Sequence, residues 1–327
     1  MVKKAAYIFT GQVKKEVDRF REYLVEKNFD QDTIRQKTNY AGYYLTWLEA
    51  ERLTPADARY NDITSFIDHC RGNGKTVYNM NRTLGAIRTY YGFLKLENPG
   101  IANPAANVIL KGTRIKVPGD IVKIAELEKV YNAYPATSNR TRRNKIILGL
   151  LVYQGVTTDE LHRLKPEHVK LKEGKIYIPS GKRSNSRGLE LKPFQILELH
   201  EYLTGIRPKI IAGIGSKTPA RLACRPGRKP AKINKTRIEN QLFISINGSE
   251  NMKNSLMHLF TDIKKINANI KNPKQIRASV IVDWLKHYNL RQVQYMAGHR
   301  YVSSTERYQA NNLENLKSQV EKFHPLK

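Results

Sequence analysis

The first hundred residues carry hydrophobic side chains at helical spacing, which predicts a series of short amphipathic helices. Two of them span residues 12–27 and 31–51, and two more follow near 62–71 and over 75–97. Thr54 followed by Pro55 is typical of an N-cap and first-turn proline, so a further helix is expected there. The hydrophobic positions that share a face in the first two helices are Val13, Val17, Phe20 and Leu24, and Tyr40, Tyr44, Trp47 and Leu48. Four or five helices in this length predict a small all-α domain.

A segment of different composition separates this helical region from the rest of the chain. Residues 98–119, NPGIANPAANVILKGTRIKVPG, are rich in proline and glycine and end in a basic cluster. Such composition is typical of a linker between domains, and a basic linker can also lie against DNA. We therefore predict two domains, 1–117 and 118–327.

The second half alternates helical patterns with one short stretch of strand character. The β-branched and aromatic run at 175–179 and the run at 189–191 are joined by a turn rich in Gly, Ser and Asn, which predicts an antiparallel β-hairpin. The helices predicted around it span residues 124–134, 142–155, 194–203, 253–270, 277–288 and 312–323. The whole chain is therefore expected to be mainly α, with an all-α first domain and a mainly helical second domain that contains a small β-hairpin sheet.

The charge of the chain indicates a polyanionic partner. Lysine and arginine number 57 against 29 aspartate and glutamate, a formal net charge of +28. Residues 118–327 hold 38 of the basic side chains and 17 of the acidic ones, so the excess lies mainly in the second half. Because so large a charge repels itself in a compact protein, nucleic acid is the expected partner. Binding to an anionic membrane surface is a weaker alternative. The hydrophobic content of 40% argues against a disordered basic tail.

The remaining composition excludes several other classes of protein. The two cysteines, Cys70 and Cys224, are far apart and lack metal-ligand neighbours, so neither a disulfide scaffold nor a cysteine-based zinc site is expected. The N-terminus lacks the apolar stretch of a signal peptide, and no run of 18 apolar residues predicts a membrane span. The expected location is the cytoplasm, in association with the nucleoid.

Three stretches of the second half carry the residues of a recognisable chemistry. Residues 291–309, RQVQYMAGHRYVSSTERYQ, place His299 after a glycine and Tyr308 nine residues later. This stretch resembles the closing motif of the tyrosine recombinases, the family of lambda integrase, Cre and the Xer proteins. The stretch KQIRASVIVDWLKH resembles the family's His-x-x-Arg-His box, with Arg277 at the arginine position. The stretch YQGVTTDELHRLKPEHV resembles a third box, and the residues that match it are Gly155, Glu160, Leu161 and Leu164.

The resemblance implies both an activity and a fold. It covers most of 118–327, which it identifies as a catalytic domain, and makes 1–117 similar to the family's core-binding domain. It implies that Tyr308 attacks a DNA phosphate to form a 3′-phosphotyrosyl intermediate, with neither metal nor nucleotide cofactor. The implied partners are a double-stranded recombination site and three further copies of the chain in a tetramer, with accessory DNA-bending proteins as a possibility. A C-shaped clamp on duplex DNA is the implied architecture.

The chemistry of strand cleavage gives each of these side chains a role. Opening a phosphodiester without metal needs a nucleophile, a proton donor for the leaving 5′-hydroxyl and cations around the developing phosphorane. Arg277 would hold non-bridging oxygens in a fork that lysine cannot reproduce. Lys182, in the predicted hairpin turn, would be the general acid, and His299 would bind the phosphate or assist proton transfer. The alternatives are ordinary ones: a tyrosine or histidine in a core, an arginine in a surface ion pair, and a solvated lysine.

Two positions depart from the family pattern. Thr157 stands where the first box normally has an arginine, and Lys274 stands three residues before Arg277, where histidine or lysine is usual. The integrases of Bacteroides conjugative transposons resemble this pattern, with a small hydroxyl residue at the first position. A working enzyme must replace the missing charge, and Lys274 is the first candidate because it precedes Arg277 by one helical turn. The other candidates are Arg163, Arg183 and Arg187.

Further basic residues are candidate DNA contacts. The segment 205–240 holds ten lysines and arginines and one acidic residue, so it is either a solvated loop or an insertion along DNA phosphates. The candidates are Arg225, Arg228 and Lys229 in this segment, Arg183 and Arg187 in the hairpin turn, and Lys75, Arg82 and Arg88 in the first domain. The last three share a helix with Tyr78, Asn79, Asn81 and Tyr90, which suits phosphate and base-edge contacts. A structural helix with a hydrated face is the alternative.

Two rival functions remain at this point. The first is a DNA-binding or regulatory relative that keeps the fold but has lost cleavage, and Thr157 is the residue that favours it. The second is a monomeric relaxing enzyme of the type IB topoisomerase class, which shares the chemistry but is disfavoured by the helical domain in front.

Overall fold

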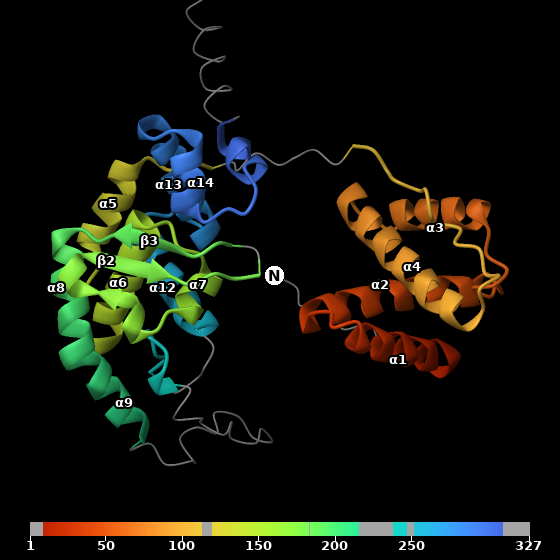
Figure 1. Cartoon of the computed structure of the whole chain (residues 1–327), viewed down its shortest axis with the longest axis horizontal. Coiled ribbons are helices and arrows are strands. Elements are labelled where there is room, and N and C mark those ends of the chain that lie inside the picture. The colour runs from red at the N-terminus through yellow and green to blue at the C-terminus, as the bar shows by residue number, and fades with distance from the viewer. Residues whose placement is uncertain (1–8, 113–119, 183, 216–237, 247–251, 310–327) are drawn as a thin grey trace, which may run out of the picture. The chain divides into compact units, whose positions relative to one another are not determined.

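The chain forms two compact units, Met1–Ile115 and Lys116–Lys327 (Figure 1). The computed structural model describes residues 9–112, 120–182, 184–215, 238–246 and 252–309. In these described ranges helices make up most of both units, and the second unit contains a three-stranded antiparallel sheet. The predicted mainly α fold with a small antiparallel sheet is therefore confirmed. The predicted helix at 312–323 and the candidate residues Arg183, Arg225, Arg228 and Lys229 lie outside the described residues.

Over residues 9–112, the first unit contains four helices around an aromatic core. They are α1 (Gly11–Glu26), α2 (Gln31–Ala50), α3 (Tyr60–Gly72) and α4 (Val77–Glu97). The predicted stripe of α1 is buried, because its four apolar side chains face the core formed with α2 and α4. The expected helix at Thr54 is wrong: the Thr54 hydroxyl donates to the Asp57 carboxylate in a turn, and the next helix begins at Tyr60.

The second unit packs its helices around a larger core. The helices before the sheet are α5 (Ile124–Ala133), α6 (Asn139–Tyr153) and α7 (Thr158–Arg163). Those after it are α8 (Pro193–Glu201), α9 (Arg207–Gly215), α12 (Lys253–Ile266), α13 (Pro273–His287) and α14 (Leu290–Ala297), and a π-helical turn (Tyr202–Ile206) joins α8 to α9. α13 contacts α5 and α6, and its residues 275–282 are buried in succession. A helix buried on nearly all sides lies inside the domain, so a polar side chain on it is protected from water.

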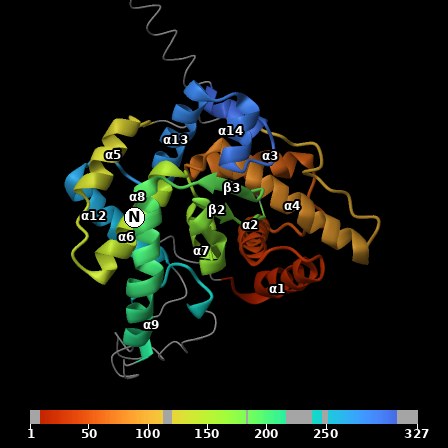
Figure 2. The same cartoon turned by 60° about the vertical axis from the view of Figure 1, so that its left-hand side comes forward.

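The sheet brings the predicted hairpin next to the C-terminal helices. Its strands are β1 (Val169–Lys170), β2 (Lys175–Ile178) and β3 (Arg187–Glu190), paired antiparallel in that order. Ile176 and Leu189 pair across β2 and β3 with their side chains in the core. β3 begins two residues earlier than the sequence predicted and contacts α14 (Figure 2). The hairpin that was expected to carry the general acid therefore lies beside the helix that leads to His299.

Two helices of this unit, α7 and α9, were not predicted as regular structure. The short helix α7 was missed, although Thr157 and Glu160 form a capping box at its start.

Among the described helices, none is long and apolar enough to span a membrane.

Candidate active site

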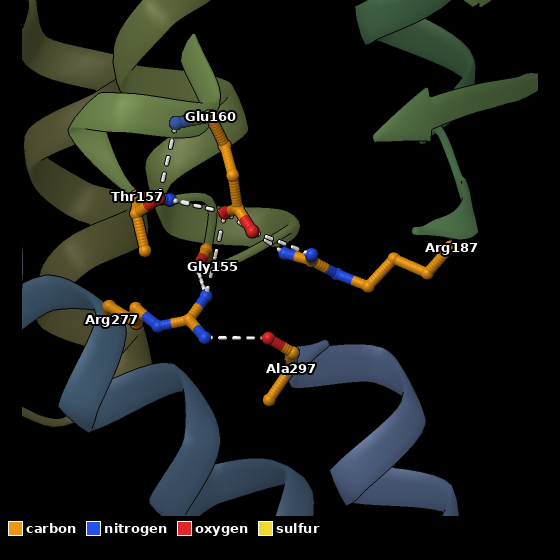
Figure 3. A network of polar contacts seen from close by, with 6 residues as sticks. All are labelled: Gly155, Thr157, Glu160, Arg187, Arg277 and Ala297. Carbon is orange, nitrogen blue, oxygen red and sulfur yellow. Dashed lines mark hydrogen bonds and ion pairs between the residues drawn. The ribbon is translucent and has the colours of Figure 1, made fainter. Parts of the chain in front are cut away.

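Arg277 is held in a fixed position in the interior of the second unit. Its side chain comes from α13 and is 11% exposed. Nη1 donates to the carbonyl of Gly155, and Nη2 donates to the carbonyl of Ala297 at 2.6 Å (Figure 3). Gly155 precedes α7, and Ala297 ends α14 just before His299. The planar guanidinium therefore joins two of the three predicted motifs, which a single ammonium group could not do in the same way.

Glu160 lies beside Arg277 and is completely buried with Arg187. Arg187 donates from Nη1 and Nη2 to the two carboxylate oxygens at 2.7 and 3.1 Å, and both side chains are 0% exposed. The other anchor is Thr157, whose N–H donates to Glu160 Oε2 at 2.8 Å. Burial would raise the pKa of Glu160, but Arg187, the Thr157 N–H and Arg277 outweigh it and lower the pKa to about 2. Glu160 is therefore ionised at any physiological pH.

His299 follows a glycine that ends α14 in the left-handed conformation. Gly298 has φ +66°, a left-handed conformation that favours glycine, and it ends α14 directly before His299. His299 Nδ1 lies 2.9 Å from the Thr305 hydroxyl, so one ring nitrogen is fixed by a hydrogen bond. Burial, then the charges of Arg277 and Arg187, lower the pKa of His299 to about 4, and Glu160 opposes them. The imidazole is therefore neutral near pH 7.

Tyr308 stacks on His299. Their ring centroids are 5.9 Å apart with an angle of 13° between the planes. Tyr308 lies in a helical stretch, 303–309, and is half-buried, with its ring packed against Ile281, Val293 and Ala297. Burial lowers the pKa of the Arg277 guanidinium, Glu160 raises it, Arg187 lowers it further, and Tyr308 acts with Glu160 in the opposite direction. The three predicted residues Tyr308, His299 and Arg277 are thus brought together.

Lys182 sits in the exposed turn of the hairpin, close to the loop of His299. Gly181 and Ser184 bridge the base of this turn, and Ser184 also bridges to His299. Asn185 N donates to the Gly298 carbonyl at 2.9 Å. A Cβ at Gly181 would collide with the guanidinium of Arg163, so the turn also rests on α7. The hairpin is therefore joined by backbone bonds to the loop that carries His299.

Two predicted residues of this region lie in different surroundings from each other. Lys274 is exposed in the first turn of α13, one turn before Arg277, and its role at the phosphate stays a prediction. The prediction that Arg187 contacts DNA from the hairpin turn is wrong. Arg187 is the first residue of β3 and points inward to Glu160, because the side chains of β3 alternate between solvent and core.

In the first unit, the three candidate DNA contacts on and beside α4 have different surroundings. Lys75 Nζ lies 3.0 Å from the centroid of the Tyr43 ring. Arg82 is exposed and contacts Tyr78 and Gln36, whereas Arg88 is half-buried and its Nη1 donates to the carbonyls of residues 105 and 108. Their contacts to DNA stay predictions. Two neighbours do not suit base contacts: Asn81 bonds the Leu110 backbone through both amide atoms, and Tyr90 is buried.

Two supporting residues of this cluster had no role predicted from the sequence, although Glu160 matched the third box. Thr305 holds His299, and Glu160 holds Arg187 and contacts Arg277 at 3.9 Å. The capping-box spacing of Thr157 and Glu160 was a local sign of the second. Within the described ranges, no group of three or more His, Cys, Asp or Glu side chains could hold a metal ion. The chemistry that the cluster itself offers is nucleophilic attack by a phenol beside a buried guanidinium and a neutral imidazole.

The lowered pKa of His299 predicts how stability depends on pH. In the unfolded chain a histidine binds its proton near pH 6.5, but folded His299 resists protonation down to about pH 4. The unfolded state therefore binds more protons in this window, and the free energy of unfolding should fall as the pH drops through it. Between pH 7 and pH 5 we expect a loss of about 1–2 kcal/mol from this residue, measured by urea unfolding.

The His299→Gln variant isolates this contribution from the other histidines. It should show a loss smaller by that amount over the same pH interval, whatever its stability at pH 7. Glu160 does not interfere, because its depressed pKa makes it lose stability only well below pH 5. Equal losses in the wild type and the variant would show that His299 titrates normally in the folded protein.

Comparisons with known proteins relate the chain to one family. The model of the phage integrase family matches residues 122–315, more than half of the chain. The tyrosine recombinase XerC of Oceanobacillus iheyensis is 23% identical over 320 residues, which cover 96% of this chain and 97% of that protein. The tyrosine recombinase XerD of Chlorobaculum tepidum is 28% identical over 210 residues, covering 63% and 68% respectively.

Solved structures share the fold at low sequence identity. The XerH site-specific recombinase bound to palindromic difH substrate, in a post-cleavage complex, has a TM-score of 0.68 at 16% identity and covers 96% of this chain and 98% of its own. The Tn1549 transposon integrase in complex with transposon right end DNA has a TM-score of 0.61 at 14% identity, with 92% and 99% covered. The likeness extends over both units of the chain.

Proposed function

The chain belongs to the phage integrase family, and we propose that it is a site-specific DNA recombinase that cleaves and rejoins strands through a 3′-phosphotyrosyl intermediate. The observation that carries the proposal is the cluster of Tyr308, His299 and Arg277. A phenol stacked on a neutral imidazole, within electrostatic range of a buried guanidinium, supplies a nucleophile, a proton-transfer group and an anion-binding group at one place.

Each group takes part in a balanced displacement at phosphorus. The Tyr308 oxygen forms a bond to phosphorus as the bond to the 5′-oxygen breaks. Lys182 gives its proton to the leaving 5′-oxygen, and neutral His299 can accept the phenolic proton or hydrogen-bond a non-bridging oxygen. Arg277 stabilises the developing charge in a site that is largely closed to water. Ligation is the reverse reaction with the 5′-hydroxyl of another strand, so no external energy source is needed.

The proposed substrate is a double-stranded recombination site. The net charge of +28 supports a DNA partner, and the solved relatives include recombinases bound to DNA. Exchange between two sites requires four protomers, so we propose a homotetramer on DNA, with accessory DNA-bending proteins as further partners. A DNA-associated location follows from this substrate.

A DNA-binding relative without cleavage activity is the second candidate function. It is favoured by one observation, the neutral Thr157 at the position where the family pattern has its first arginine. Loss of one preorganised cation at a developing oxyanion typically costs about 10²–10³ in rate. The two candidates differ in covalent chemistry and not in DNA binding.

A trapping experiment distinguishes these candidates. Duplexes selected by binding from a random library are synthesised with a 5′-bridging phosphorothiolate at successive positions, so that cleavage releases a thiol that religates poorly. The recombinase should give a covalent protein–DNA adduct on a denaturing gel at one position in each strand. Tight, sequence-selective binding without an adduct at any position would favour the non-cleaving relative.

The basic segment 205–240 predicts a salt-dependent contribution to binding. Residues 216–237 lie outside the described residues, so this prediction depends on charge alone. If four of its basic side chains contact phosphates, changing Arg225, Arg228, Lys229 and Lys232 to glutamine should lower the slope of log K against log salt by roughly 0.9 per contact. The slope is measured by fluorescence anisotropy at several salt concentrations. An unchanged slope would identify the segment as a solvated loop.

A further inference from the structure

Two buried arginines share one carboxylate at the centre of the candidate site. Glu160 accepts hydrogen bonds from Nη1 and Nη2 of Arg187, and its Oε2 lies 3.9 Å from Nη1 of Arg277. Figure 3 shows the carboxylate between the two guanidinium groups, with Thr157 at its other side. Arg187 comes from β3 and Arg277 from α13, so two distant parts of the chain converge on this one residue.

The charges of this trio do not cancel. One carboxylate faces two guanidinium groups, and the three residues, which carry a net charge of +1, are all buried. Burying an uncompensated charge is unfavourable, and an apolar pair of the same volume would stabilise a core at least as well. Arg187 Nε is also buried without a hydrogen-bond partner in the described part of the chain. Stability alone therefore does not account for Arg187.

The loop of His299 is built around the Arg187 guanidinium. A Cβ at Gly298 would collide with Nη1 of Arg187, so the left-handed glycine allows the backbone to pass directly over this side chain. The segment just before β3 is tied to the same loop, because Asn185 N donates to the Gly298 carbonyl. Arg187 is thus placed against the candidate catalytic residues by two independent features, the shared Glu160 and the close approach of Gly298.

We propose that Arg187 is the second guanidinium of the catalytic centre, supplying from β3 the positive charge that position 157 lacks. The proposal rests on the proposed function and deepens it. Because Arg187 is 0% exposed, it acts as a positioning residue and does not touch DNA. It fixes Glu160, which lies against Arg277, and adds its charge to the field at His299 and the phosphate. Thr157 contributes differently, since its N–H and hydroxyl hold Glu160 at the start of α7.

The test moves the guanidinium from position 187 to position 157. Arg187→Gln should lower the single-turnover cleavage rate on a trapped site by about 10²–10³. Thr157→Arg combined with Arg187→Gln should restore the rate to within about 10-fold of the wild type, because position 157 lies directly beside Glu160 and the variant returns a guanidinium to it. DNA affinity should change little in both variants. Arg142→Gln, which breaks an exposed ion pair between Arg142 on α6 and Glu201 on α8, is the matched control and should cleave normally.

A neutral pair keeps the test decisive if Arg187→Gln fails to fold. Glu160→Gln with Arg187→Met removes both charges at similar volume, so it should fold. If the charge matters, this folded variant should cleave about 10² more slowly than the wild type. A folded neutral-pair variant with cleavage within about 3-fold of the wild type would overturn the proposal.

A second readout separates this proposal from the proposed function. The charged and titratable groups that face His299 are Arg277, Arg187, Glu160 and Tyr308. Losing the charge of Arg187 should raise the pKa of His299, measured by NMR without DNA, by about one unit. If the wild type never forms an adduct, the proposed function fails, and the NMR shift still decides whether Arg187 acts on His299. An unchanged His299 pKa together with no rescue by Thr157→Arg would leave Arg187 a structural residue only.

Discussion

Replacing Tyr308 with phenylalanine should abolish the covalent protein–DNA adduct while folding and DNA binding persist. The change removes one oxygen, and the contacts described for Tyr308 are made by its ring, which stacks on His299 and packs on Ile281 and Val293. Phenylalanine retains those contacts but has no nucleophile. We expect no adduct above background on a phosphorothiolate site, with an unfolding midpoint within about 2 °C of the wild type.

The matched control for this variant is Tyr301→Phe. Tyr301 lies seven residues earlier in the same stretch, is 71% exposed and loses the same atom. It should form adducts at the wild-type rate. An adduct formed by Tyr308→Phe would show that another tyrosine attacks, with Tyr301 and Tyr295 the nearest candidates in the sequence. Mapping the modified peptide by mass spectrometry would identify it.

Local patterns in the sequence predicted the elements that carry the site. The stripe of α1, the long helix α4 and the β2–β3 hairpin follow from periodicity and turn composition, which act over a few residues. The motif at 291–309 gave Tyr308 and His299 because their spacing in the chain is itself short. Each of these predictions needed only neighbouring residues.

The partners of the site residues could not be predicted in the same way. Arg187 and Glu160 are separated by 27 residues, and Arg277 and Gly155 by 122, so their contacts depend on how the helices pack. A turn full of polar residues favours exposed side chains, and this led to the wrong expectation that Arg187 contacts DNA. In the structure Arg187 is instead the first residue of β3, and the side chains of this strand alternate between core and solvent. This alternation turns Arg187 toward the core.

Thr157 differs from the family pattern and also has a structural role of its own. By comparison with the family pattern it is a missing arginine, but in the structure it caps α7 and orients Glu160. Its hydroxyl accepts from Glu160 N, a role for which threonine is well suited and arginine is not. The loss of a cation at this position is therefore coupled to the gain of a fixed carboxylate, and that carboxylate is what holds Arg187.

Replacing Arg277 with lysine should lower the single-turnover cleavage rate by about 10²–10³ or more, although the charge is retained. The guanidinium donates to the carbonyls of Gly155 and Ala297 at once, and 11% of the Arg277 side chain is exposed. An ammonium group is a single point, so it leaves at least one of these buried carbonyls without a donor and shifts the loop that carries His299. The measurement is cleavage of a phosphorothiolate site at saturating protein, with DNA affinity measured in parallel.

Two comparisons make this prediction specific to Arg277. Arg142→Lys is the matched control, because Arg142 is an exposed arginine paired with Glu201 at 2.7 Å, and it should cleave at the wild-type rate. Lys274→Ala asks a separate question, since Lys274 is exposed one helical turn before Arg277 and can meet a phosphate from the same face. If Lys274 contacts the scissile phosphate, its loss should slow cleavage nearly as much as Arg277→Lys. Wild-type cleavage by a folded Arg277→Lys variant would contradict the fork geometry, because a point charge would then be sufficient at that position.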